Sequence, residues 1–439
     1  MTGQQRLLAV SVFLSVTLVA FEITSLATAM PTISRQLHGD SLFGVTSAAY
    51  TLANMVALVA AGELADRRGP ATPFTMSMTI FVVGLLVGAW APTMVWVVVG
   101  RTLQGLGSGT VGPLAYVLIA RAFPPERQPS MFALMSTGWL LPSLFAPAVS
   151  GWIVSAFGWR WVFLGIIPIA VVVATLAVIP MRAYRSAGEP TTTRMPSAVR
   201  LAVGVGTTAI ALQSGSWWVA IAAFVVGVAL AVSGGRQLFP RGLPRATTGL
   251  PAVLAVRVLA TAAFLGVDSF VPLAADRVHH ASPLVQGFTI IGAALLWSGG
   301  QWWRAHHPDV PARVSVRRGL VLMAFGAIAI TPVLSPHWPL WAVFLGWAPA
   351  GFGMGMLFNP TTVAAMSYAE EGREGRVSSQ VTLADSLGFA AMGAVGGATV
   401  AAADRGLWSI RAALGTNFAF TVALTVVAFV AARRVQART

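Results

Sequence analysis

Residues 7–30 read LLAVSVFLSVTLVAFEITSLATAM, a run of apolar side chains interrupted by one carboxylate, that of Glu22. At a rise of about 1.5 Å per residue, a helix of this length crosses the hydrocarbon core of a bilayer, which is roughly 30 Å thick. The run is too long for the apolar region of a cleaved signal peptide, so we interpret it as a retained first span. A carboxylate at this depth is costly, and such residues usually belong to an ion path or a substrate site.

The composition indicates a polytopic membrane protein. Of the 439 residues, 56% are hydrophobic and 10% are charged, whereas soluble domains carry about 25% charged residues. All 28 residues in the Lys and Arg count are Arg, so no lysine can serve as a proton switch. The net charge of +14 does not predict a nucleic-acid partner, because the arginines lie between the apolar segments.

Several other classes of chemistry are not expected. The chain has no Cys, which excludes disulfides and Cys-ligated metals. The adjacent His279 and His280 have no acidic cluster beside them, so we predict no metal site. No glycine-rich motif with a phosphate-binding lysine is present, and we therefore expect neither direct ATP use nor an enzyme.

The apolar segments form two groups of six with a shorter pair between them. The polar stretch 182–200 and the arginines of residues 236–245 flank this pair. We expect the pair to form a transmembrane hairpin, which gives 14 spans; the alternative is 12 spans without it. The predicted segments are 7–30, 43–62, 73–90, 94–120, 131–157, 162–181, then 201–212 and 217–233, then 252–273, 285–303, 320–334, 340–366, 377–402 and 410–432.

The arginines between the segments predict the orientation. With the N-terminus in the cytoplasm, the inner side receives about four times as many arginines as the outer side. This asymmetry requires an even number of central crossings and leaves both termini in the cytoplasm, in the inner (plasma) membrane. The arginines on the outer side are Arg35, Arg160, Arg277, Arg405 and Arg411.

These segments predict an all-α fold with an internal duplication. We expect an N-terminal six-helix bundle (1–181), a central linker with the hairpin (182–249) and a C-terminal six-helix bundle (250–439). Two six-span halves are common among secondary transporters, whose binding site lies near the midplane.

The turn after the second predicted span, residues 62–69, reads GELADRRG. Glycines permit the sharp turn, and Asp66 can accept hydrogen bonds from helix N-terminal amides and pair with an arginine. The turn resembles the G-x-L-a-D-r-x-G loop of the major facilitator superfamily, although residues 70–71 read PA where the family has two basic residues. The resemblance implies a conformational-switch loop made of Gly62, Asp66, Arg67 and Gly69.

Residues 101–107 of the fourth span read RTLQGLG and resemble the R-x-x-q-G-x-g motif of proton-coupled members of that family. Gly105 and Gly109 are four residues apart, so they share a face that another helix can approach closely. Arg101 and Glu22 both lie outward of the centres of their spans, and mutual neutralisation is the cheapest way to bury them. The alternative is that Arg101 extends to the outer interface.

Further stretches of the first half add to this resemblance. Residues 138–151 of the fifth span resemble an antiporter motif ending G-P-x-x-G-G, with Ala146 and Ser150 in place of glycines. Residues 159–163, WRWVF, match the opening of the sixth span in drug/proton antiporters. Residues 21–33 resemble the acidic first-helix motif of fourteen-span drug antiporters, including actinobacterial multidrug exporters, with Glu22 in place of Asp. The second half resembles the family mainly through its span layout.

Two acids interrupt spans of the second half. Asp268 lies toward the outer end of its span and Asp385 in the inner half of its own. As proton carriers we rank Glu22 first, Asp268 second and Asp385 third. Alternatively, Asp268 caps a loop at the interface, and Asp385 packs helices or pairs with an arginine. We interpret Arg257 as an anchor near the inner membrane face.

Four residues are predicted to line a substrate cavity. The dipeptide Asn359-Pro360 breaks its span and forms either a gating bend or a tolerated kink. Trp139 in the fifth span faces either an aromatic cavity or lipid, and Pro147 can bend the same helix. The predicted cavity residues are Gln104, Trp139, Pro147 and Asn359.

The resemblance implies a proton-coupled secondary transporter that exports lipophilic, cationic or neutral small molecules by alternating access. The proton gradient would supply the energy without a cofactor, and the protein would act as a monomer. Protonation of Glu22 would weaken its attraction for Arg101 or for a bound cation. Two alternatives stay open: a proton symporter or dedicated lipid or metabolite exporter of the same fold, and a passive channel or membrane sensor.

Overall fold

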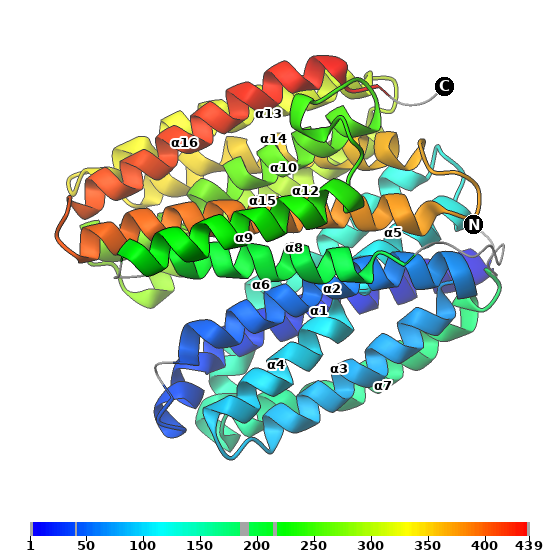
Figure 1. Cartoon of the computed structure of the whole chain (residues 1–439), viewed down its shortest axis with the longest axis horizontal. Helices are drawn as coiled ribbons and strands as arrows, with labels where there is room; N and C mark the ends of the chain where they lie inside the picture. The colour runs from blue at the N-terminus through cyan, green and yellow to red at the C-terminus, as the bar shows by residue number, and fades with distance from the viewer. Residues whose placement is uncertain (1–2, 40–41, 185–192, 214–216, 437–439) are drawn as a thin grey trace. The chain divides into compact units, whose positions relative to one another are not determined.

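A computed structural model describes residues 3–39, 42–184, 193–213 and 217–436, and these residues form helices and connecting turns without a strand. Contacts between Cα atoms divide the chain into two compact units (Figure 1). Unit 1 contains Met1–Ala202 and Ala369–Thr382, and unit 2 contains Val203–Tyr368 and Leu383–Thr439. The predicted three-segment division of the chain stays a prediction.

Unit 1 is built from the helices that precede the polar stretch. In it, α1 packs against α6 and α7, and α4 packs against α2 and α3. Its helices are α1 (Gly3–Gln36), α2 (Phe43–Arg68), α3 (Ala71–Ala89), α4 (Met94–Ser108), α5 (Val111–Ala122), α6 (Gln128–Phe157) and α7 (Arg160–Met181).

Unit 2 has α14 packed against both α12 and α13, while α10 packs against α14 and α16. Its helices are α9 (Trp217–Leu238), α10 (Leu250–Asp268), α11 (Val271–His279), α12 (Pro283–His306), α13 (Ala312–Ile330), α14 (Trp341–Met366) and α16 (Ile410–Ala431), with the short 3-10 turns η2 (Leu243–Arg245), η3 (Thr331–Leu334) and η4 (Ala432–Arg434).

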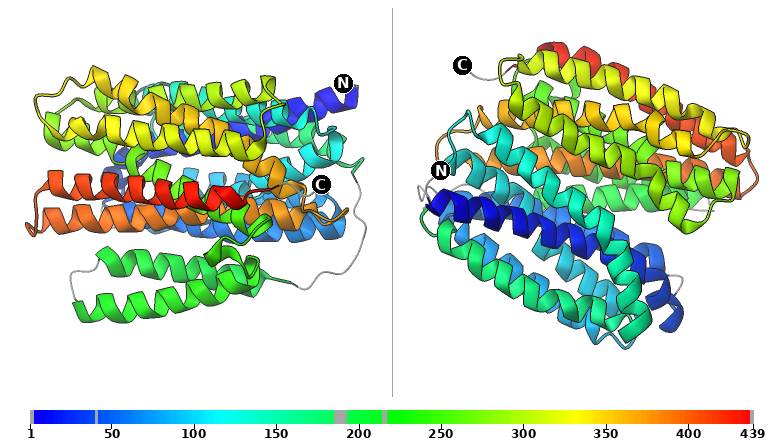
Figure 2. Two further views of the ribbon diagram at one scale, coloured as in Figure 1. Left: turned by 90° about the horizontal axis from the view of Figure 1, so that it is seen from above. Right: turned by 180° about the vertical axis from the view of Figure 1, so that it is seen from behind.

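Two helices belong to both units. Helices α8 (Met195–Gln213) and α15 (Glu374–Asp404) begin in unit 1 and continue into unit 2. The parts of α8 and α9 in unit 2 lie side by side as the predicted hairpin (Figure 2). Gly204 and Gly227 allow this close approach, because a Cβ on either residue would strike the backbone of the other helix.

The helices agree with the predicted spans. Among the described residues, 13 helical segments are long and apolar enough to cross a membrane. In that count α4 and α5 form one segment, Met94–Ala122, and α10 and α11 form another, Leu250–His279. Helix α12, which is not among them, has 24 residues and is therefore also long enough to span a bilayer at about 1.5 Å per residue. The predicted 14-span architecture is consistent with these helices.

The break between α10 and α11 was not predicted. Helix α10 ends at Asp268 and α11 begins at Val271, so the ninth span consists of two helical pieces. Pro272 at the start of α11 explains the break, because proline lacks the N–H that would continue the hydrogen-bond ladder. The break leaves Asp268 at a helix end within the span.

Candidate functional site

The structure brings Glu22 of α1 and Arg101 of α4 together in unit 1. The Arg101 Nη1 atom donates to Glu22 Oε1 and, at 2.9 Å, to Gln104 Oε1. The Glu22 side chain is 0% exposed and that of Arg101 is 7% exposed. The guanidinium also lies over the ring of Tyr50, with Cζ 4.1 Å from the ring centroid. The two charges therefore neutralise each other inside the helix bundle instead of reaching the interface.

Glycines allow the helices around this ion pair to approach closely. A Cβ on Gly105 would strike the carbonyl oxygen of Tyr50, and one on Gly109 would crowd Asn54 and Ala57. These neighbours belong to α2. This confirms the predicted shared glycine face of α4, which brings the Tyr50 ring within reach of Arg101.

The ion pair leaves polar atoms unsatisfied. Glu22 Oε2, Arg101 Nε and Gln104 Nε2 are buried without a hydrogen-bond partner among the described residues. Buried polar groups are nearly always paired, so orphaned atoms need an explanation such as a functional change of partner.

A second cluster in unit 1 surrounds the turn after α2. Asp66 Oδ1 accepts from the backbone amide of Gly375 at 2.8 Å, and Oδ2 accepts from that of Arg376 at 3.0 Å. These amides lie in the first turn of α15, where the helix dipole favours a negative charge. Arg121 Nη2 lies 3.7 Å from Asp66 Oδ1, and Arg121 Nε donates to Glu374 Oε2 at 3.0 Å. The contacts expected of this aspartate are therefore present.

The other residues of the predicted switch loop shape the turn. Gly62 allows α2 to touch α15, because a Cβ there would strike the carbonyl oxygen of Gly375. Gly69 has a φ of 78°, a conformation that side chains other than glycine rarely adopt. Arg67 is exposed at the end of α2.

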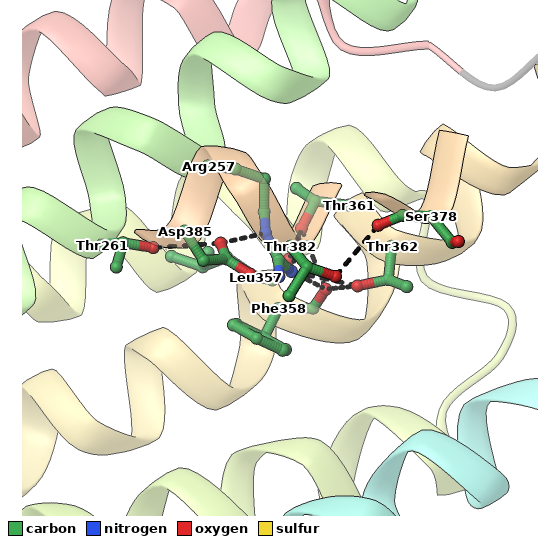
Figure 3. A network of polar contacts seen from close by, with 9 residues as sticks. All are labelled: Arg257, Thr261, Leu357, Phe358, Thr361, Thr362, Ser378, Thr382 and Asp385. Atoms are coloured by element: carbon green, nitrogen blue, oxygen red, sulfur yellow. Dashed lines mark hydrogen bonds and ion pairs between the residues drawn. The ribbon is translucent and has the colours of Figure 1, made fainter. Parts of the chain in front are cut away.

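Unit 2 contains its own ion pair, between the fully buried Arg257 of α10 and the partly exposed Asp385 of α15 (Figure 3). Arg257 Nε donates to Asp385 Oδ1 at 2.8 Å and Nη2 donates to Oδ2, so the contact is bidentate. Arg257 Nη1 donates at 3.0 Å to the carbonyl oxygen of Phe358 and to Thr362 Oγ1. Thr261 donates to Asp385 Oδ1 at 3.2 Å.

The interpretation of Arg257 as an interfacial anchor is wrong, because its side chain is 0% exposed. The guanidinium also lies over the ring of Phe358, 3.6 Å from the centroid. The sequence held one signal for this pairing: each of the two spans carries an internal charge, and the two are of opposite sign.

Asp268 has a different environment. Its Oδ1 accepts from Trp347 Nε1 of α14 at 2.8 Å. Trp347 is fully buried and stacks on Phe264, with centroids 5.2 Å apart. Asp268 itself is partly exposed. Its partner is thus an uncharged indole on a neighbouring helix.

The predicted cavity residues fall into two groups. Gln104 and Asn359 are buried, at 0% and 1% exposure. Trp139 is 48% exposed and Pro147 is also exposed, both on α6. Gln104 joins the Glu22–Arg101 pair, and the roles of the other three residues stay predictions.

Metal ligands do not cluster in the described part of the chain, where no group of three or more His, Cys, Asp or Glu side chains could hold an ion. Among the described residues, the carboxylates inside the predicted apolar segments instead occur in two Arg–carboxylate pairs and one contact to a tryptophan.

Proteins of known name resemble the chain over most of its length. It is 27% identical over 420 residues to a "Probable multidrug-efflux transporter" of Mycobacterium tuberculosis, covering 90% of this chain and 87% of the relative. It is 26% identical over 413 residues to the "Drug efflux pump JefA" of that species, covering 88% and 79%. A third relative, the "Probable multidrug resistance protein EmrY" of Escherichia coli, is 30% identical over 190 residues, 43% of this chain and 37% of the relative.

Solved structures share the fold at low sequence identity. The human organic anion transporter MFSD10 superposes with a TM-score of 0.74 at 14% identity, covering 98% of this chain and 100% of that one. The proton:xylose symporter XylE superposes with a TM-score of 0.70 at 14% identity, covering 97% and 94%. The sequence model of the Major Facilitator Superfamily matches residues 12–393. The chain is therefore a multi-pass membrane protein that belongs to the Major Facilitator Superfamily.

Proposed function

We propose that this protein is a proton-coupled secondary transporter that exports lipophilic small molecules, cationic or neutral, across the inner membrane by alternating access. The names of the relatives support drug export. The Glu22–Arg101 pair is the observation that carries the proton coupling, because it places a titratable group inside the membrane next to a fixed positive charge.

The chemistry of the pair suggests how coupling works. An ionised Glu22 attracts Arg101 and holds α1 to α4, whereas a protonated Glu22 loses most of that attraction. Protonation thus changes the free energy of one helix contact without breaking the bundle.

The switch loop supplies the second part of the proposal. Asp66 joins the end of α2 to the first turn of α15 through two backbone amides. Such a contact can form in one conformation of the cycle and open in another. We assign Gly62, Asp66, Arg67 and Gly69 to this latch.

Transport by purified protein in proteoliposomes with an imposed pH gradient tests the proposal. We expect uptake of a fluorescent lipophilic cation, ethidium, into liposomes that are acidic inside, and loss of that uptake when an ionophore collapses the gradient. Glu22→Gln should abolish the gradient dependence, whereas Glu22→Asp should retain part of it. Glu126→Gln, at an exposed acid in a loop, is the matched control.

The outcomes separate the alternatives. Flux that does not depend on the gradient, in the wild type and in Glu22→Gln alike, would point to a channel. Substrate accumulation in the direction of proton flow would point to a symporter. Either result contradicts the antiport proposed for this chain.

A further inference from the structure

The three acids within the spans differ in whether an arginine compensates them. Glu22 pairs with Arg101 and Asp385 with Arg257. Asp268 contacts the Trp347 indole, and it forms no ion pair with any described residue. A carboxylate in a low-dielectric span is stable when it is protonated or when a cation is beside it. Asp268 is therefore the acid whose charge an arriving group can compensate.

Aromatic rings adjoin Asp268 on neighbouring helices. Phe264 lies one turn before Asp268 on α10 and stacks on Trp347, the hydrogen-bonding partner of Asp268. Trp297 of α12 meets Phe264 edge-on, with centroids 5.0 Å apart, and Phe358 lies 5.4 Å from Trp297. These four rings form a continuous wall, which we call the aromatic wall.

The wall and the acid are accessible in part. Asp268, Trp297 and Phe358 are partly exposed, whereas Phe264 and Trp347 are buried. A partly exposed carboxylate within a span does not face lipid, because the cost of a charge in hydrocarbon is too high. We therefore expect the exposed side of Asp268 to meet water or a polar group instead of lipid.

We propose that Asp268 and the aromatic wall form the binding site for an aromatic monocation. The carboxylate would hold the positive group, and the exposed part of the Trp297 ring would stack on the ligand, because the guanidinium of Arg257 already lies over the ring of Phe358. This inference rests on the proposed transport function and deepens it, because it assigns the substrate cation to Asp268 and the proton to Glu22. Substrate and proton then use different carboxylates.

Binding to the purified full-length protein in detergent tests the site with two probes. Ethidium is a planar aromatic cation, and N-phenyl-1-naphthylamine is a neutral aromatic molecule; the fluorescence of both changes on binding. We expect Asp268→Asn to weaken ethidium binding about tenfold or more and to leave the neutral probe unchanged. Asp268→Glu should restore ethidium binding in part, and Glu126→Gln, at an exposed acid in a loop, should leave both affinities unchanged.

Two tryptophan substitutions test the contribution of the aromatic wall to binding. Trp297→Leu should weaken the binding of both probes, whereas Trp341→Leu, at a tryptophan that is 71% exposed, should change neither. Ethidium affinity that is unchanged in Asp268→Asn would overturn the proposal, and so would an equal loss of both probes. Ethidium binding that depends on Asp268 without gradient-driven transport would leave this site standing and remove the proposed function.

A separate observation concerns Glu63, one turn before Asp66 on α2. Glu63 Oε1 accepts from the backbone amide of Arg194, and Oε2 accepts from the hydroxyl of Thr193 at 3.1 Å. The Arg194 carbonyl receives the first helical hydrogen bonds of α8, from Ser197 at 2.9 Å and Ala198 at 3.0 Å. Glu63 therefore binds the start of α8 as Asp66 binds the start of α15.

The two helix starts meet the same turn of α2, because Glu63 and Asp66, which bind them, lie three residues apart on that helix. Burial and the neighbouring positive charge of Arg376 lower the pKa of Arg194, while Glu63 raises it. Arg376 lies in the first turn of α15, so charges at both helix starts interact. Both helices begin in unit 1 and continue into unit 2.

From these contacts we infer that the switch loop and the neighbouring Glu63 form a double latch, in which Glu63 holds the start of α8 and Asp66 holds the start of α15. The absence of Cys from the chain allows spin labels to be placed without background. One label pair joins Arg68→Cys to Val199→Cys on α8, and the other joins Arg68→Cys to Arg373→Cys before α15. Arg68 and Val199 are exposed, and Arg373 is 44% exposed at its side chain.

We expect Glu63→Ala to shift the first distance distribution to longer values and Asp66→Ala to shift the second. Glu63→Gln, which keeps an acceptor, should have a smaller effect, and Glu126→Ala should have none. An unchanged distance between positions 68 and 199 in Glu63→Ala would overturn the double latch.

Discussion

Glu22 and Arg101, which lie 79 positions apart in the sequence, form an ion pair that is almost completely enclosed by unit 1. The pair is held without full hydrogen bonding, since Glu22 Oε2 and Arg101 Nε have no partner among the described residues. Its energetics therefore rest on charge compensation, and they can be measured directly.

Removal of Arg101 alone should lower the free energy of unfolding more than removal of both charges of the Glu22–Arg101 pair. Arg101→Met leaves Glu22 buried and uncompensated, which typically costs about 3–5 kcal/mol. The double variant Glu22→Gln with Arg101→Met removes both charges and should be more stable than Arg101→Met alone. Thermal unfolding in detergent, followed by tryptophan fluorescence, gives the interaction energy of the double-mutant cycle. Additive effects of the two substitutions would contradict this coupling.

Arg257 should not tolerate replacement by lysine. A lysine at this position keeps the charge but loses the bidentate contact to Asp385 and the bonds to Phe358 and Thr362. We expect Arg257→Lys to lower the unfolding temperature by several degrees, and Arg405→Lys, at an exposed position, to leave it unchanged. Equal unfolding temperatures for the two variants would show that the bidentate geometry is unimportant.

Gly62 should be sensitive to a single added methyl group. Alanine there would force the end of α2 away from Gly375 and weaken the contact to α15. We expect Gly62→Ala to reduce transport and stability, although alanine favours helices by roughly 0.5–1 kcal/mol over glycine. Gly165→Ala in α7 is the control, because no atom lies within 4 Å of its added Cβ. Full transport by Gly62→Ala would argue against a close contact in the cycle.

Trp347→Phe should separate the two roles of Trp347. Phenylalanine can still stack on Phe264, but it cannot donate to Asp268. We expect a stability loss of about 1–2 kcal/mol, the range for an unmade buried hydrogen bond. Asp268→Asn combined with Trp347→Phe should cost little more than Trp347→Phe alone, as measured by thermal unfolding. A full additional loss would show that the two side chains act independently.

The sequence was informative about spans because hydropathy reports directly on membrane depth. It also predicted the meeting of Glu22 with Arg101, since two opposite charges at similar depth gain most by neutralising each other. The predicted contacts of Asp66 followed from the chemistry of a carboxylate at a helix end.

The contacts that were not predicted depend on which face of each helix points into the bundle, and hydropathy does not contain that information. Arg257 stands near the start of α10, which begins at Leu250, so its depth alone fits an interfacial anchor as well as a buried partner of Asp385. The contact between Glu63 and the start of α8 was not predicted either, because the residue types do not indicate which distant backbone amide this side chain meets.

The enclosure of Glu22 bears on the energy supply of the cell. A carboxylate open to water on both sides of the membrane at once would conduct hydrogen ions and dissipate the proton gradient that other membrane proteins use. At 0% exposure, Glu22 can exchange its hydrogen ion only when neighbouring helices separate. In the proposed cycle each exchange is then tied to a conformational step, so that the resting protein does not leak hydrogen ions across the membrane.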